Sequence, residues 1–150
     1  MALKPVLILV FVAIMAISFA EAQSQLGIVH VNGTLYCTAN GSPGANGNAT
    51  PVFPNASVQV VCSPNVVPTT PANATTDANG VYRVVLVPWS NATADSVVSA
   101  CRLFVLTPLS NCNPTLPSAG LVSNIQFVRS VFFSFLRVTY FVATGFAPQP

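Results

Sequence analysis

Four cysteines, Cys37, Cys62, Cys101 and Cys112, limit the folds open to this chain more than any other feature of its sequence. They form an even set, and the segment before them has the form of a secretory signal peptide. We therefore expect two disulfides, although sequence alone allows three pairings. A metal site is disfavoured because no two cysteines have C-x2-C spacing, and the one histidine, His30, lies seven residues before Cys37.

The N-terminal segment explains why an oxidising compartment is expected. Lys4 is followed by an almost unbroken apolar stretch over residues 6–19, and residues 20–22 (Ala-Glu-Ala) give a small-x-small cleavage site. A signal anchor is the alternative, but the small and polar residues that follow the apolar stretch favour cleavage. The sequence therefore predicts a signal peptide over residues 1–22 and a secreted, extracellular mature chain.

The mature chain, residues 23–150, is expected to form a single domain with very little charge. Charged residues make up 5% of the full sequence and the net charge is +2, whereas typical soluble domains have about 25% charged residues. Such a weak positive charge excludes a nucleic-acid-binding surface, which needs clustered Lys and Arg. Low charge and high apolar content also favour self-association.

N-linked glycans are the expected substitute for charge, because they are bulky and solubilising. Six Asn-x-Ser/Thr sequons follow the predicted cleavage site: Asn32, Asn40, Asn48, Asn55, Asn73 and Asn91. We expect at least two to be occupied. Asn55 precedes an alternating apolar segment, and it should mark the rim where a loop enters a strand.

Short alternating apolar segments separated by turn residues predict an all-β domain. Strands are expected over residues 28–38, 57–62, 81–87 and 98–106, with loops over 39–56 and 63–76. The proline-rich segment 107–120 is excluded as a regular central strand. Three sets of residues are expected to face the core: Val58, Val60 and Cys62; Tyr82, Val84 and Leu86; and Cys101, Leu103 and Val105. The fold expected is a small antiparallel β-sandwich or barrel, Greek-key-like, stapled by two disulfides.

Residues 125–146 allow three interpretations: core strands, which we favour, an amphipathic surface helix, or a membrane span. A span is disfavoured because Arg129 and Arg137 lie inside the segment. A two-residue period separates Phe132 from Arg129, Phe133 and Arg137, whereas a helix would place these last three on one side. The pattern does not decide between strand and helix.

Candidate catalytic residues are few. The mature chain has two carboxylates, Asp77 and Asp95, and both lie at positions suited to turn or cap formation. His30 has no acidic neighbour in the sequence. We therefore expect no enzymatic activity, no cofactor and no catalytic residues.

The segment 127–141 is instead a candidate membrane-interface segment. It combines two arginines with aromatic residues, a composition suited to the boundary between lipid headgroups and acyl chains. The candidate residues are Arg129, Phe132, Phe133, Phe135 and Arg137. The alternative is that the aromatic side chains fill the core.

Several motifs resemble the phylloplanins, a family of secreted plant surface proteins. They are TPVFPNASVQVVC (50–62), NGVYRVVL (79–86) and TPLSNCNPTLPSAG (107–120). The wider pattern is similar to the olive-pollen-allergen family of extracellular proteins: Gly-x-Leu-x-Cys (33–37), Ala-Ser-Val-x-Val-x-Cys (56–62) and Gly-x-Tyr (80–82).

The resemblance implies specific disulfides, Cys37–Cys112 and Cys62–Cys101. These cysteines match the wider family's first and fifth and its third and fourth, while the second and sixth, which pair with each other, are both absent here. It also implies a small antiparallel β-barrel or sandwich.

In function, the resemblance implies an antimicrobial glycoprotein of the leaf surface or apoplast. Such a protein would inhibit fungal or oomycete spores through an unidentified target on the pathogen. The wider family implies instead an extracellular module that binds cell-wall polysaccharide or cuticle.

Overall fold

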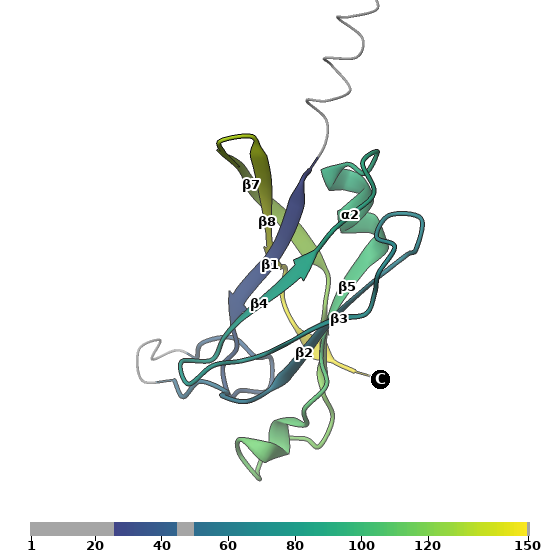
Figure 1. Cartoon of the computed structure of the whole chain (residues 1–150). Coiled ribbons are helices and arrows are strands. Elements are labelled where there is room, and N and C mark those ends of the chain that lie inside the picture. Colours follow the sequence, from purple (N-terminus) through teal and green to yellow (C-terminus); the bar gives the residue numbers. More distant parts are fainter. Residues whose placement is uncertain (1–25, 45–49, 150) are drawn as a thin grey trace, which may run out of the picture.

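The computed structural model describes residues 26–44 and 50–149, so the predicted signal peptide and Asn48 lie outside the described residues. Two β-sheets pack against each other (Figure 1). The four-stranded sheet has the order β4-β1-β8-β7, and the five-stranded sheet has the order β3-β2-β5-β6-β9. The strands are β1 (Ile28–Thr34), β2 (Ser57–Cys62), β3 (Ala72–Thr75), β4 (Val81–Leu86), β5 (Cys101–Val105), β6 (Leu121–Ser123), β7 (Ile125–Phe133), β8 (Leu136–Ala143) and β9 (Ala147–Pro148). This is the all-β sandwich expected from the sequence.

Alternation along three strands fills the core between the sheets. The predicted inward faces of β2, β4 and β5 are all buried: Val58, Val60 and Cys62; Tyr82, Val84 and Leu86; Cys101, Leu103 and Val105. Val29 and Val31 of β1 and Phe141 of β8 add to the four-stranded sheet's contribution, and all three are fully buried. Successive strand side chains point to opposite faces, so each strand covers the core with every second residue.

One strand pairing departs from the antiparallel expectation. β1 pairs with β8 in parallel, from Ile28 opposite Val138 to Val31 opposite Phe141. The other named strand pairs in the described residues are antiparallel. A parallel pair needs a long crossover, and here nearly the whole domain supplies it. Strand β8, which lies late in the chain, therefore sits beside the first strand, β1, within the four-stranded sheet.

The expected strand over residues 98–106 is wrong at its start. Residues 94–100 form the short helix α2 (Ala94–Ala100), and β5 begins only at Cys101. Thr93 is the N-cap: its hydroxyl accepts a hydrogen bond from the Ser96 N–H at 3.1 Å, and the Ser96 hydroxyl accepts one from the Thr93 N–H at 2.8 Å. This reciprocal capping, with Asp95 in the first turn, stabilises the helix.

Three other boundaries also differ from expectation. β1 ends at Thr34 rather than at residue 38, because the Leu35 N–H donates to the Gly80 carbonyl and Tyr36 forms only an isolated bridge. The expected loop 63–76 contains β3 as an edge strand. Residues 107–120 hold a 3-10 turn, η2 (Leu109–Asn111), and no named strand, as the prolines predicted.

The two disulfides join different parts of the fold. Cys62 and Cys101 lie directly opposite each other on β2 and β5, with a Cα–Cα distance of 4.0 Å. Cys37 pairs with Cys112, which ties the loop after β1 to the residue that follows η2, with a Cα–Cα distance of 6.0 Å. These are the pairs that the family resemblance implies.

Candidate membrane-interface site

Residues 125–143, most of the ambiguous segment 125–146, form the β7–β8 hairpin, which settles the choice between strand and helix. Phe133 pairs with Leu136, so Ser134 and Phe135 alone make the turn. The hairpin stands at the end of the molecule where β1 begins (Figure 1). The first residue of β1 is Ile28, which lies opposite Val138. The hairpin therefore extends past the start of β1 as a two-stranded ribbon, with Gly27 still packed against the backbone of Arg137.

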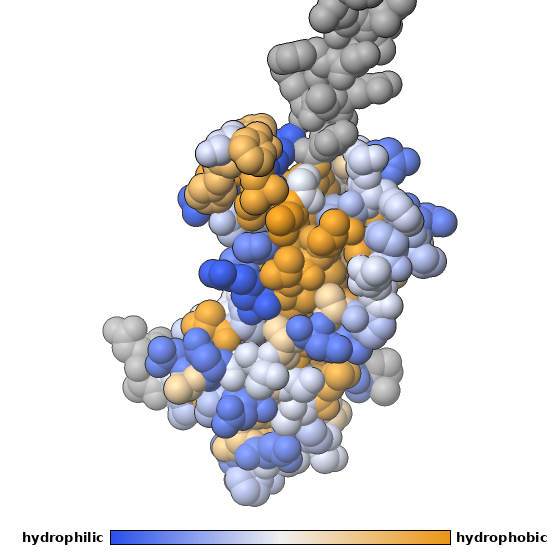
Figure 2. Space-filling model, viewed as in Figure 1, coloured by the Kyte–Doolittle hydropathy of each residue, from blue (hydrophilic) through white to orange (hydrophobic). Residues whose placement is uncertain are grey.

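The end of this ribbon is the most exposed apolar surface in the described part of the chain. We call its four residues, Phe132, Phe133, Phe135 and Leu136, the hairpin tip. Phe135 is 100% exposed, Phe132 67%, Phe133 55% and Leu136 42%. Figure 2 shows apolar surface covering the projecting hairpin. Such a cluster usually marks a binding or membrane-contact surface.

The turn does not use the residues that hairpin folding favours. Ser134 has a left-handed backbone with φ of 57°, a conformation that Gly or Asn adopts at lower cost. Phe135, at the apex, buries none of its surface against the fold. Neither residue improves the hairpin's own stability, so the apolar apex is better explained by a contact outside the chain.

The tip is apolar on both of its faces. Phe132 lies opposite Arg137, and Phe133 lies opposite Leu136. Opposite residues share a face and successive residues do not, so Phe132 and Phe133 project to different sides. Docking on a flat protein surface would cover only one of these sides. An environment that surrounds the ribbon would cover both.

The two arginines lie behind the tip and pack on aromatic rings. The guanidinium carbon of Arg137 is 5.3 Å from the centre of the Phe132 ring, and that of Arg129 is 5.5 Å from the centre of the Tyr140 ring. The expected separation of Phe132 from Arg137 is therefore wrong. The two-residue turn breaks the alternation between β7 and β8, and it therefore brings Phe132 and Arg137 onto one face.

An apolar groove continues from the base of the tip. It has a volume of about 240 Å³ and is lined by Leu26, Ile28, Val87, Trp89 and Leu136. In Figure 2 apolar surface runs from the hairpin along β1 and β4. Trp89 and Leu136 were not among the site residues predicted from the sequence, because their contribution depends on strand ends that are distant in sequence.

Comparison with known proteins places this chain in a family. A family model described as "Phylloplanin antifungal protein" matches residues 25–150. The chain belongs to the phylloplanin family. The protein named Phylloplanin from Nicotiana tabacum is 35% identical over 136 residues, which cover 87% of this chain and 80% of the tobacco protein. No solved structure matches.

The predicted glycosylation sites of this family member differ in accessibility. Asn40, Asn55, Asn73 and Asn91 are exposed. Asn55 lies two residues before β2, at the rim where the sequence placed it. Asn32 is different, because it lies within β1, is half-buried, and its side-chain oxygen is buried without a hydrogen-bond partner in the described residues.

Asp77, Asp95 and His30, the three candidate catalytic side chains, each take part in local structure. The Asp77 carboxylate accepts hydrogen bonds from the N–H groups of Asn79 at 2.8 Å and Val81 at 3.0 Å, which builds the turn before β4. Asp95 lies in the first turn of α2. His30 packs edge-on against Tyr140 with ring centres 5.6 Å apart. Burial lowers the pKa of His30, and the nearby Arg83 lowers it further.

Within residues 26–44 and 50–149, no three His, Cys, Asp or Glu side chains are grouped to hold a metal ion. None of the helices in that same part of the chain is long and apolar enough to cross a membrane.

Proposed function

We propose that this chain is a secreted, non-enzymatic antifungal protein of the leaf surface. In this proposal it inhibits fungal or oomycete spores by inserting the hairpin tip into the interface of the pathogen's membrane. The description of the matching family supports the antifungal part, and the identity with the tobacco Phylloplanin supports membership of that family. The single observation that supports insertion is the fully exposed Phe135 at the apex of the projecting hairpin.

The reach of the hairpin suits insertion into an interface rather than across a bilayer. Phe135, at the apex, lies two residues from Arg137 along the chain. At about 3.4 Å per residue, the apex stands about 7 Å beyond Arg137. Interfacial segments bury their apolar face about 5–10 Å into the boundary between headgroups and acyl chains. Phe135 would therefore reach the acyl region while the Arg137 guanidinium stayed among the headgroups.

Apolar burial would supply most of the binding energy. Given the exposed fractions of its four side chains, burying the hairpin tip would contribute on the order of 4–8 kcal/mol, before the cost of association. Each arginine near an anionic surface adds about 1 kcal/mol. Electrostatic attraction is therefore secondary, as the low net charge of +2 also requires.

A spore-germination assay with three purified proteins tests the proposal. They are the wild type, Phe133→Ser/Phe135→Ser, and Leu106→Ser as the control. Leu106 is 47% exposed and lies outside the hairpin, so its substitution removes exposed apolar surface elsewhere on the fold, although less than the double substitution removes. The wild type and the control should inhibit germination, whereas the tip variant should not. Full inhibition by a folded tip variant would reject insertion of the hairpin tip.

Two parallel measurements separate the proposal from its alternatives. A pull-down with wall polysaccharide and isolated cuticle tests the extracellular binding role. Retention of all three proteins, with no inhibition of spores, would replace the antifungal proposal with wall or cuticle binding. Sedimentation velocity tests self-association. A wild-type dimer that the tip variant cannot form would assign the tip to a second copy of the chain.

A further inference from the structure

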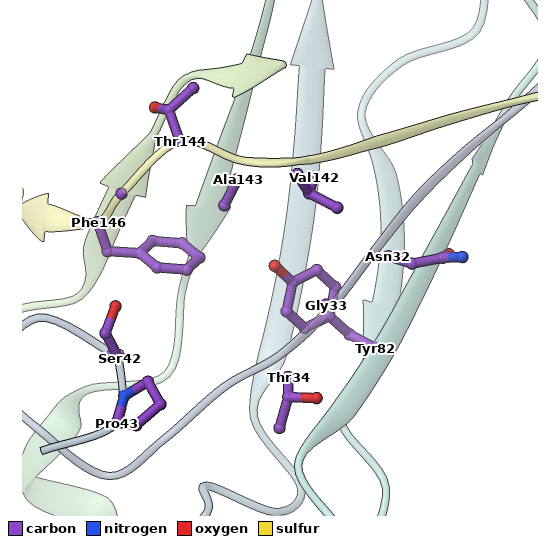
Figure 3. A pocket seen from close by; sticks show the side chains of 12 residues that line it. Asn32, Gly33, Thr34, Ser42, Pro43, Tyr82, Val142, Ala143, Thr144 and Phe146 are labelled. Atoms are coloured by element: carbon purple, nitrogen blue, oxygen red, sulfur yellow. The ribbon is translucent and has the colours of Figure 1, made fainter. Parts of the chain in front are cut away.

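A small pocket lies at the opposite end of the four-stranded sheet from the hairpin tip, beside the C-terminal end of β1 (Figure 3). Its volume is about 210 Å³. Six of its lining residues define what we call the Tyr82 pocket: Gly33, Thr34, Ser42, Tyr82, Thr144 and Phe146. They come from β1, from β4, from the loop after β1 and from the segment after β8.

The hydroxyl of Tyr82 is the unusual group in this pocket. Tyr82 is 2% exposed, and none of the described residues forms a hydrogen bond with its hydroxyl. The hydroxyl oxygen itself keeps contact with the open space of the pocket, where a ligand can pair with it. A Cβ at position 33 would overlap this oxygen, so Gly33 is what allows the hydroxyl to lie there. Figure 3 shows the oxygen at the cavity side of the ring, directed toward Ala143 and Phe146.

Other hydroxyl groups and one aromatic ring surround the same space. Thr34, Ser42 and Thr144 bring side-chain hydroxyls, and Phe146 brings a half-buried ring. No Asp, Glu, Lys, Arg or His is among the residues that line the pocket. Burial raises the pKa of Tyr82 to about 12, so the phenol remains a hydrogen-bond donor at physiological pH.

This lining selects the chemistry of a ligand. A charged ligand would lose its hydration and find no opposite charge. A purely apolar ligand would leave the Tyr82 hydroxyl unpaired, which costs about 1–3 kcal/mol. The lining suits a neutral molecule that has hydroxyl groups at its edge and a C–H face for the Phe146 ring. A pyranose sugar has both.

We propose that the Tyr82 pocket binds one neutral pyranose unit of an external polysaccharide. The Tyr82 hydroxyl donates a hydrogen bond to a sugar oxygen, and the Phe146 ring contacts the apolar face of the sugar. The volume of about 210 Å³ is below the roughly 300–1,000 Å³ of sites that enclose drug-sized ligands, so the pocket holds one ring rather than a chain.

The chain's own glycans are the competing occupants, because two sequons border the pocket. Thr34 completes the Asn32 sequon and Ser42 completes the Asn40 sequon. In Figure 3 the Asn32 amide points away from the Tyr82 ring, so a glycan on that amide would extend away from the pocket. Asn40 is exposed, and its side-chain oxygen accepts a hydrogen bond from the Ser42 N–H at 3.1 Å. The experiment must therefore compare glycosylated and deglycosylated protein.

Saturation-transfer NMR on the secreted protein tests the proposal. The probes are glucose, mannose, galactose and N-acetylglucosamine, with glucuronic acid as a charged comparison. We expect saturation transfer to at least one neutral sugar and none to the acid, with or without the chain's own glycans. Tyr82→Phe removes the donor and keeps the ring, so its affinity should fall about tenfold, as expected for a lost hydrogen bond. Tyr140→Phe removes a hydroxyl outside the pocket and should bind like the wild type.

Four results would overturn the proposal. They are no transfer to any neutral sugar, transfer only after the chain's own glycans are removed, equal affinity of Tyr82→Phe and wild type, and preferential binding of the acid. Thermal unfolding is the structural control. Because the Tyr82 hydroxyl has no partner in the fold, Tyr82→Phe should not lower the unfolding temperature. A less stable variant with unchanged binding would assign the hydroxyl to the fold instead.

Discussion

Arg137 lies directly across the β7–β8 hairpin from Phe132, with its guanidinium carbon 5.3 Å from the centre of the ring. This pairing places a cation immediately behind an apolar hairpin tip. The long arginine side chain can keep its charge in water while its carbon atoms cover the ring. The same relationship sets the expected depth of the hairpin in a membrane and the part that charge plays in binding.

The double variant Arg129→Ser/Arg137→Ser should weaken binding to anionic vesicles without abolishing it. At about 1 kcal/mol for each arginine near the surface, the loss should be about fivefold per residue. Vesicle co-sedimentation at low and high salt measures it, and the variant should lose most of the salt dependence. Binding to zwitterionic vesicles, which depends on the apolar tip, should remain.

A thermal unfolding control is needed for this variant, because both arginines pack on aromatic rings. If the variant is folded and its vesicle binding and spore inhibition equal those of the wild type, the arginines have no part in either.

Peptide mapping of the secreted protein should find glycans on at least two of the exposed sequons, Asn40, Asn55, Asn73 and Asn91, and none on Asn32. The reason is placement: Asn32 is half-buried within β1, and its side-chain oxygen has no contact with solvent. A fully occupied Asn32 in folded protein would contradict the placement of that side chain.

The strand faces could be predicted from the sequence because they depend on local alternation. Val58 and Val60, or Tyr82 and Val84, need only the two-residue period to be assigned to the core. The helix α2 was missed because its cap uses Ser96 where the common signature has Glu or Gln. The parallel pairing of β1 with β8 joins residues more than 100 positions apart. No local pattern encodes such a pairing.

Mild reduction should open Cys37–Cys112 before Cys62–Cys101. The first pair is half-buried, whereas Cys62 is 6% and Cys101 is 1% exposed, so an attacking thiolate reaches the first pair more readily. Timed alkylation followed by mass spectrometry measures the order. Simultaneous opening, or early loss of Cys62–Cys101, would contradict the burial of this pair between β2 and β5.

Replacing both Cys62 and Cys101 with Ala should lower the free energy of unfolding by about 4 kcal/mol. The bridge spans 39 residues, and closing a loop of that length restricts the unfolded chain by about this amount. Denaturant unfolding in oxidising buffer measures the change. A loss below about 1 kcal/mol would show that the strands hold their register without the bridge.

Stability should fall as the pH drops from 7 to 5.5, through protonation of His30. Burial and Arg83 lower the pKa of His30 in the folded state, whereas an unfolded histidine has a pKa of about 6.5. The unfolded chain therefore binds the proton first. The contribution is fully present above pH 6.5 and is lost as the pH falls toward the folded pKa.

His30→Gln should remove this pH dependence, because His30 is the only histidine in the sequence. Urea unfolding at half-unit pH steps makes the comparison. Parallel curves for variant and wild type, or a wild type that gains stability on acidification, would contradict the environment assigned to His30.

The candidate site was predictable only in part. The sequence indicated that Phe132, Phe133 and Phe135 lie near two arginines, but the same aromatics could equally have filled the core. The distinction depends on where β1 begins relative to the hairpin, with Ile28 opposite Val138. The bulge after Phe127 adds a second long-range effect, because it changes which side chains of β7 share a face. Neither feature has a local signature.

Insertion of the hairpin tip is tested most directly by a fluorophore at its apex. In a Trp89→Phe background, which removes the one native tryptophan, Phe135→Trp places an indole at the fully exposed position. On adding vesicles of pathogen lipids, its emission should shift to the blue and be quenched by lipids brominated on the acyl chain. Emission that remains that of a water-exposed indole, in a protein that still inhibits spores, would contradict insertion.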